Sequence, residues 1–374
     1  MNTLASSRFA SSRLLGPVVS ILAVILGLAI SFALIALNGQ PPGEAARALF
    51  DGAFGSKKQT AATIARALPL VLVALGWIVA FSARRINVGL EGQMIVGGIT
   101  GTCIALYLPG VPTGLHLVLA LIVGIAGGAV YAGIAAGLWA WRGVNEIVST
   151  LLMNFIALQL LSWVVRGPMK APGVRSNRSG TIPDSAQWSN LIAQSPLNID
   201  VFMVVGLALL VAWMLRYTTF GMRLRVTGAN EHAARASGIR TVSVGLTALM
   251  VSGGLAGLAG AGLVLGGETE VMAEGFASSF GLEGIVVALL ALNSPRATIP
   301  AALLLASLHQ GGGLMEARLG VPAELTLVTQ GIVLLFVTGS AAIVRRARTV
   351  RVDLDEVDSD RSQASLGPTA QVTT

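Results

Sequence analysis

The chain has 374 residues, of which 54% are hydrophobic and only 11% are charged. An average soluble domain carries about 25% charged residues, so this composition excludes a soluble globular domain and indicates a protein that crosses a membrane several times. The net charge of +7 is interpreted as a signal of membrane topology, and a nucleic-acid binder is excluded.

Ten segments approach the length of about 20 apolar residues that a membrane-spanning helix needs. The first is longer than the apolar core of a cleaved signal peptide, so we expect it to remain in the protein as a span. The fold class is therefore all-α and polytopic, with about 10 transmembrane helices. The predicted spans cover residues 17–37, 67–83, 86–108, 115–141, 144–165, 201–215, 244–266, 280–292, 297–314 and 325–344.

The distribution of Lys and Arg predicts the orientation. With the N-terminus inside the cell, 16 of the 25 basic residues lie on the cytoplasmic side, so both termini are expected in the cytoplasm. The domains predicted are a cytoplasmic arm (1–16), a transmembrane domain (17–344) and a disordered cytoplasmic tail (345–374). Within the transmembrane domain we expect an external loop at 166–200 and a cytoplasmic segment at 216–243.

Three carboxylates, Glu91, Glu146 and Glu283, lie in or at the ends of apolar runs. Placing an ionisable group in hydrocarbon costs about 2.5–3.5 kcal/mol, so each carboxylate needs a reason to be there. No apolar run contains a Lys or Arg at depth that would balance them. They can line a polar path for a solute, or they can cap helices that begin inside the membrane. The two roles are compatible. With the polar residues beside them, the pathway candidates are Asn87, Glu91, Gln93, Asn145, Glu146, Asn154 and Glu283.

Repeated glycine patterns suggest how the helices are arranged. The tetrapeptide Gly-Leu-Glu-Gly occurs at 89–92 and again at 281–284, at the starts of spans that run in opposite directions. This predicts an inverted repeat in which helices 2–5 match helices 7–10. Glycines four residues apart, as in the pairs Gly253/Gly257 and Gly262/Gly266, predict helix faces that pack closely against neighbours.

Residue patterns for catalysis or metal binding are missing from the sequence. It has no phosphate-binding GxxxxGK[ST] loop, no HExxH-type histidine spacing and no nucleophile elbow. The single cysteine, Cys103, excludes a disulfide framework and is expected to be a small buried side chain, and His309 is expected to be a polar packing residue. We therefore predict no catalytic residue, metal or cofactor, and if ATP drives the protein, another chain binds it.

The cytoplasmic segment 216–243 contains a short predicted helix. Gly228 is expected to make a turn, Asn230 to cap the helix at its N-terminus, and Gly238 to end it. The helix is rich in alanine and has little apolar mass. This favours a smooth surface that fits the groove of a partner protein over a basic helix lying on lipid.

Here the sequence resembles a known family. The pattern Phe-Gly-x-x-x-Arg-x-x-Gly-Ala-Asn-x-x-Ala-Ala-x-x-x-Gly-Ile at 220–239 resembles the coupling loop of ABC importer permeases of the branched-chain amino acid/ribose/nucleoside superfamily. Residues 87–93, 144–157 and 284–290 resemble its nucleoside (guanosine, simple-sugar) branch. The likeness spans about residues 60–345.

This resemblance implies a permease subunit in a bacterial plasma membrane. Two permeases, identical or paralogous, would form the pathway, two ATPase subunits would dock on the cytoplasmic face, and an extracellular binding protein would deliver the solute. Closure of the ATPases would push the coupling helix and switch the bundle between inward and outward access. The coupling residues that the resemblance implies are Gly228, Asn230, Ala233, Ala234 and Gly238.

Other functions remain open from the sequence. A permease for branched-chain amino acids or ribose belongs to the same superfamily. An ion-coupled secondary transporter would use Glu91 and Glu283 as proton or sodium sites, but it would not need the motif at 228–238. An intramembrane enzyme is disfavoured because no nucleophile–base pair or metal cluster is visible.

Overall fold

A computed structural model describes residues 22–191, 195–266, 271–322 and 324–339. The predicted arm at 1–16 and the predicted tail at 345–374 lie outside these described residues. The chain divides into two units, one formed by Met1–Pro42 with Glu324–Thr374 and the other by Gly43–Ala323.

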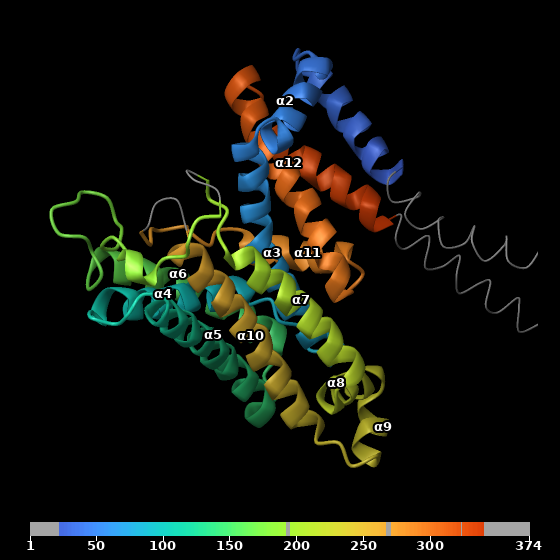
Figure 1. Ribbon diagram of the computed structural model, residues 1–374. Coiled ribbons are helices and arrows are strands. Elements are labelled where there is room, and N and C mark those ends of the chain that lie inside the picture. The colour runs from blue at the N-terminus through green and yellow to red at the C-terminus, as the bar shows by residue number, and fades with distance from the viewer. Residues whose placement is uncertain (1–21, 192–194, 267–270, 323, 340–374) are drawn as a thin grey trace, which may run out of the picture. The chain divides into compact units, whose positions relative to one another are not determined.

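The larger unit is a bundle of helices, and the described residues form only isolated β-bridges and no β-strand. The prediction of an all-α protein is confirmed. Figure 1 shows the helices. Helices α8 and α9 lie at one end of α7 and α10, and we call this end of the bundle the α9 end. The helices are α2 (Pro42–Phe54), α3 (Lys57–Ser82), α4 (Leu90–Tyr107), α5 (Leu115–Arg142), α6 (Glu146–Arg166), α7 (Asp200–Tyr217), α8 (Thr219–Ala229), α9 (Glu231–Ala236), α10 (Thr241–Leu265), α11 (Phe280–Leu290) and α12 (Thr298–Leu319), with single 3₁₀ turns at Asp184–Ala186 and Pro295–Ala297.

The smaller unit contains two apolar helices, Leu22–Leu37 and Glu324–Gly339. They pack closely at one point, because a Cβ added to Gly27 would lie only 2.9 Å from the Cα of Val333. These helices occupy the first and last of the ten predicted spans.

The centre of the larger unit is formed by α3 and α10. In the most apolar 18-residue stretch of each, 78% of the residues are buried within the chain, against 28% in α5 and α6 and 17% in α7. A helix that is apolar on all sides and enclosed by protein belongs to a core, while helices with exposed apolar faces are suited to contact lipid.

Glycine allows α10 to approach its neighbours at backbone distance. A Cβ on Gly257 would lie 2.9 Å from the Cα of Gly128 in α5, and a Cβ on Gly97 in α4 would collide with the Gly257 backbone. This confirms the predicted packing face at Gly253 and Gly257. By contrast, Gly262 has no atom within 4 Å of the position a Cβ would take, so it does not contribute to that face.

All ten predicted spans coincide with helices, but their boundaries differ. Among the described residues, five helices (α3, α5, α6, α7 and α10) are long and apolar enough to cross a membrane, or six if the bent pair α11–α12 counts as one span. That pair bends by 118°, so the predicted spans at 280–292 and 297–314 form a broken span or a re-entrant loop. Helix α3 begins ten residues before its predicted span, and α2 was not predicted. Cys103 is exposed rather than buried.

The third predicted span differs in a way that bears on function. Residues 83–89, which we call the link, are not helical; they run from the end of α3 back into the bundle before α4 begins. Asn87 in the link donates a hydrogen bond of 2.9 Å to the Oγ of Ser252, which lies halfway along α10. Helix α4 therefore starts at mid-depth in the bundle.

Helix α11 starts at the same depth. A Cβ added to Gly281 would lie 2.5 Å from the Cβ of Glu91, and a Cβ added to Gly284 would collide with Val73 in α3. Both copies of Gly-Leu-Glu-Gly thus lie at helix starts that touch one another. We call residues 87–93 and 279–284 together the mid-depth junction.

Candidate functional site

Glu91 joins the two helix starts of the mid-depth junction. It lies in the first turn of α4, and its carboxylate accepts a hydrogen bond from the backbone of Ser279, the residue before α11. A carboxylate is favourable there because the first N–H groups of a helix have no partner within the helix. Glu91 thus caps a helix that begins inside the bundle, which supports the structural interpretation of this residue.

Glu283 has a basic partner that the sequence did not reveal. Its carboxylate lies 3.3 Å from a guanidinium nitrogen of Arg66 in α3, and each of the two side chains is 19% exposed. The same nitrogen of Arg66 lies 3.2 Å from Nδ1 of His309 in α12, and its guanidinium stacks over the ring of Phe280. The expectation that no basic residue balances these carboxylates at depth is therefore wrong for Glu283.

The amide side chains of the junction are used to hold the backbone. Asn87 is fully buried, and it exchanges hydrogen bonds of 2.8 and 3.0 Å with the side chain of Gln93. Asn154 in α6 accepts a hydrogen bond from the N–H of Gly92 and donates one to the carbonyl of Val88. The two bonds of Asn154 satisfy backbone groups that the break between α3 and α4 leaves free.

The remaining two candidates lie elsewhere, at the α9 end. Asn145 caps α6 by accepting a hydrogen bond from the N–H of Ile147. Glu146 lies 3.7 Å from Arg85 in the link. The structure thus brings together Asn87, Glu91, Gln93, Asn154 and Glu283 and separates them from Asn145 and Glu146.

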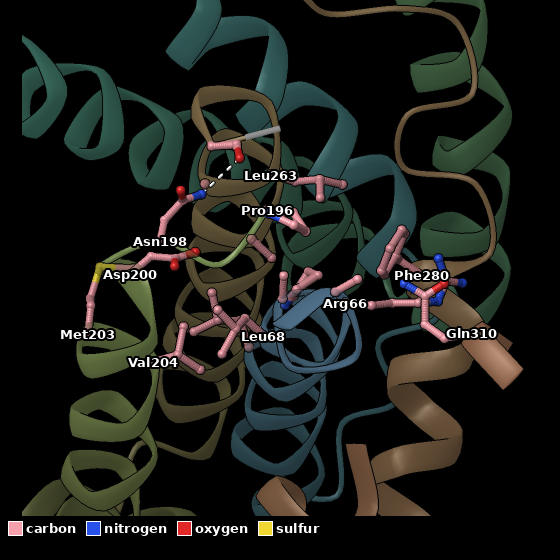
Figure 2. Close-up of a pocket in the computed structure, with 17 residues that line it drawn as sticks. Arg66, Leu68, Pro196, Asn198, Asp200, Met203, Val204, Leu263, Phe280 and Gln310 are labelled. Atoms are coloured by element: carbon pink, nitrogen blue, oxygen red, sulfur yellow. Dashed lines mark hydrogen bonds between the residues drawn. The ribbon is translucent and has the colours of Figure 1, made fainter. Parts of the chain in front are cut away.

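A cavity of about 280 Å³ lies beside the junction, between α3, α7 and α10. Figure 2 shows Arg66, Phe280 and Gln310 gathered on one side of it and Asn198 and Asp200 on the other. Arg66 Nε and Asp200 Oδ1 are buried without a hydrogen-bond partner among the described residues.

The sequence candidates did not include this cavity. The available signal was weak, because Arg66 and Asp200 each stand one residue before a predicted span and were counted as part of external connections. Arg66 lines the cavity and contacts Glu283 and Phe280 of the mid-depth junction. The two features therefore form one polar region inside the bundle.

The short helix α9 matches its prediction in most respects. Asn230 caps it by accepting hydrogen bonds from the N–H groups of His232 and Ala233, and Gly238 ends it with a φ of +80°. The predicted turn at Gly228 is wrong: Gly228 lies inside α8, where a Cβ would collide with the carbonyl oxygen of Ser82. Its glycine permits close packing of α8 on the end of α3.

Two of the predicted coupling residues differ sharply in exposure. Ala233 is exposed on α9, whereas Ala234 is fully buried within the chain. A docking partner can touch Ala233 but not Ala234. The expected role of Ala234 as an interface residue is therefore corrected to packing α9 onto the bundle.

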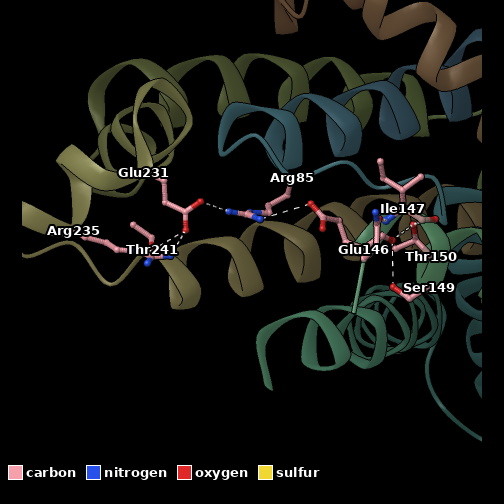
Figure 3. A network of polar contacts seen from close by, with 9 residues as sticks. Arg85, Glu146, Ile147, Ser149, Thr150, Glu231, Arg235 and Thr241 are labelled. Atoms are coloured by element: carbon pink, nitrogen blue, oxygen red, sulfur yellow. Dashed lines mark hydrogen bonds and ion pairs between the residues drawn. The ribbon is translucent and has the colours of Figure 1, made fainter. Parts of the chain in front are cut away.

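Arg85 connects α9 to the rest of the α9 end (Figure 3). It lies 2.7 Å from Glu231 in α9 and 3.7 Å from Glu146 in α6, and its guanidinium lies 4.2 Å from the ring centre of Trp139 in α5. Burial alone would raise the pKa of Glu231, but the hydrogen bond from Arg235 and the positive charges of Arg85 and Arg235 hold it below its usual value.

A helical membrane bundle in which broken helices meet at mid-depth is typical of proteins that move solutes across membranes. Residues 59–338 match the family described as the permease component of the branched-chain amino acid transport system. The chain belongs to this family, so it is a transport component rather than an enzyme.

Several curated relatives extend over most of the chain. The guanosine ABC transporter permease protein NupP of Bacillus subtilis is 31% identical over 87% of this chain and 94% of its own length. The glucose ABC transporter permease protein TsgB13 of Haloferax volcanii is 33% identical over 86% of both chains. The nucleoside ABC transporter permease protein NupB of Lactococcus lactis is 28% identical over 85% of this chain and 90% of its own.

Among solved structures, PsaBC from Streptococcus pneumoniae in complex with Fab is 17% identical and covers 79% of this chain and 94% of its own, with a TM-score of 0.40. This similarity is too low to define the fold.

Proposed function

We propose that this chain is the permease subunit through which an ABC importer moves nucleosides or related ribosides. The observation that carries the proposal is the similarity to guanosine and nucleoside permeases along nearly the whole chain. The polar region inside the bundle agrees with it, because amide, carboxylate and guanidinium groups suit the hydroxyls and base edges of such solutes.

A hexose is the second candidate solute. The glucose permease TsgB13 is as similar to this chain as the nucleoside permeases are. Sugars and ribosides share the hydroxyl groups that polar side chains would bind, so the residues of the junction do not discriminate between the two classes. The discriminating feature is the base, which an apolar wall such as Leu68, Leu72 and Phe280 would accommodate.

The proposed assembly contains further chains. An ATPase subunit would dock on the exposed face of α9, and a second permease and a binding protein outside the cell would complete the importer. The excess of arginine at the α9 end supports the placement of this end on the cytoplasmic side of a bacterial plasma membrane. Under this proposal residues 17–344 form the transmembrane domain, with 166–200 outside and 216–243 inside.

We further propose that the solute path borders the mid-depth junction. Glu91 and Glu283 interact electrostatically there and are only partly enclosed. Asn87, Gln93 and Asn154 would hold the backbone beside the path rather than touch the solute, since their amide groups are engaged with the chain itself.

Uptake in cells that carry the complete system, with and without this chain, tests the solute. Labelled guanosine, glucose, ribose and leucine would be offered separately at equal concentration. We expect guanosine uptake that requires the chain, and we expect that unlabelled glucose does not inhibit it. Chain-dependent uptake of glucose, ribose or leucine in place of guanosine would contradict the nucleoside assignment while keeping the permease family.

A further inference from the structure

The link joins the two places where function has been proposed. At one end it follows α3 at Ala83, close to α8 and α9; at the other end it enters the mid-depth junction at Asn87. Only Ile86 separates Arg85, which contacts α9, from Asn87, which is bonded to the middle of α10. The link is therefore a short path from the surface of the α9 end to the centre of the bundle.

The contact between Arg85 and α9 is largely buried and is supported by several neighbouring side chains. Arg85 is only 11% exposed, and its guanidinium is sandwiched among Glu231, Glu146 and the ring of Trp139. An ion pair shielded from water is screened less by salt than an exposed one. A guanidinium also offers several donors in a fixed plane, so it holds partners on different sides at once.

Glu231 is held from the side of α9 as well. It pairs with Arg235 at 2.6 Å and accepts a hydrogen bond of 3.3 Å from Thr241, the first residue of α10 (Figure 3). Because the pair with Arg235 fixes the carboxylate relative to its own helix, a displacement of α9 moves the carboxylate with it, and the bond from Thr241 ties the same carboxylate to the start of α10. The position of Arg85 then follows the position of α9.

At its other end the link cannot move without its neighbours. Asn87 bonds to both Gln93 and Ser252, and Val88 is held by Thr150 and Asn154 through its N–H and its carbonyl. A shift of Arg85 therefore reaches the start of α4, where Glu91 caps α11. The chain of contacts from α9 to the junction is continuous.

We propose that Arg85 is a positioning residue that transmits movement of α9 to the mid-depth junction. The proposal rests on the proposed docking of an ATPase on α9. In this proposal, the side chain of Arg85 carries a displacement of α9 at the surface of the bundle to the broken helices at its centre. The change at the broken helices is a discrete rearrangement of packed elements.

The test follows the link directly and needs no transported solute. Val88→Cys would be introduced with Cys103→Ser, and the thiol at position 88 would be labelled with a maleimide in the complete complex in lipid. Labelling rates would be compared without nucleotide and with ATP and vanadate. The variants would be Arg85→Gln, Arg85→Lys and Glu231→Gln, with Arg84→Gln as the matched control, since Arg84 is the neighbouring, exposed arginine of the link.

In the parent protein and in Arg84→Gln, we expect nucleotide to change the labelling rate by about fivefold or more, as for a typical coupling between sites. Arg85→Gln and Glu231→Gln should abolish this change although the ATPases still hydrolyse ATP. Arg85→Lys, which keeps the charge, should give an intermediate change and covers the case in which Arg85→Gln does not assemble.

Two results would overturn the proposal. The first is a nucleotide-dependent change in the labelling rate of Arg85→Gln that equals the change in Arg84→Gln, or, if Arg85→Gln does not assemble, such a change in both Glu231→Gln and Arg85→Lys. The second is a parent protein in which nucleotide does not change the labelling rate at position 88. The assay separates this proposal from the assigned solute. If guanosine is not the solute, guanosine uptake fails while the labelling response remains. If no ATPase docks on this chain, the complex itself cannot be isolated.

Discussion

Arg66 and Glu283 are 217 residues apart in the chain, yet their side chains form an ion pair of 3.3 Å inside the helical bundle. The pair connects α3 to the first turn of α11. Because α11 is only 11 residues long and begins at mid-depth, its start depends on contacts of this kind.

The first prediction concerns the stability that this pair provides. Removing one partner leaves a charge in a place largely shielded from water, so Arg66→Met or Glu283→Gln should each lower the free energy of unfolding by about 3 kcal/mol. Replacing both, as Arg66→Met with Glu283→Leu, should recover most of that loss. Thermal unfolding of the purified permease measures the effect, and equal losses in the single and double variants would contradict it.

Glycine packing gives a second prediction, with a control in the same helix. Gly257→Ala should lower the free energy of unfolding by about 1–3 kcal/mol, because a Cβ there would lie 2.9 Å from the backbone of Gly128. Gly262→Ala should be neutral or slightly stabilising, since nothing lies within 4 Å of its added Cβ. The comparison would fail if the two variants unfolded at the same temperature.

The third prediction distinguishes the two alanines of α9. Ala233→Asp places a charge on the exposed face, so it should abolish transport while the permease remains folded and inserted in the membrane. Ala234→Asp buries the same charge and should lower the amount of folded protein instead. Uptake and membrane abundance are measured together. Wild-type uptake in Ala233→Asp would contradict docking on α9.

A fourth prediction uses the pH dependence of Glu231. Its pKa is held below the ordinary value of 4.5, so the ionised form stabilises the folded state above that pH. This contribution should disappear as the pH falls through the lowered pKa. The difference in melting temperature between the parent protein and Glu231→Gln should therefore be largest above about pH 5 and shrink in acid. A difference that grows in acid would have the wrong sign.

Local rules were sufficient for the parts of the fold that depend on neighbours in sequence. Hydropathy located a helix in each of the ten predicted spans, and the cap Asn230 and the stop Gly238 set the bounds of α9. Each of these signals acts within a few residues, as capping and helix termination do.

Features that depend on distant contacts could not be predicted in this way. Ile86 and Val88 are apolar, so the sequence places residues 86–89 of the link in the third predicted span, although hydrogen bonds to α6 and α10 hold them out of a helix. Glycine is typical of turns, but Gly228 lies inside α8, where the absence of a side chain allows close packing against Ser82 of α3. Arg66 stands just before a predicted span, so the sequence places it in an external connection, and its partner Glu283 is too far away in the sequence, at 217 residues, for the pairing to be predicted.

The inverted repeat remains a prediction. The two Gly-Leu-Glu-Gly copies do lie together, one in the first turn of α4 and one in the first turn of α11. Superposing α3–α6 on the helices from α10 onward, after inverting one set, would decide whether the halves match helix for helix.

In the proposed importer, ATP hydrolysis on a partner subunit drives solute through this chain. The most direct measurement of this coupling is the chain-dependent uptake of labelled guanosine in cells depleted of ATP with the ion gradient kept, and in cells with the gradient collapsed and ATP kept. We expect that uptake stops in the first case and continues in the second. Uptake that follows the ion gradient and ignores ATP would contradict it.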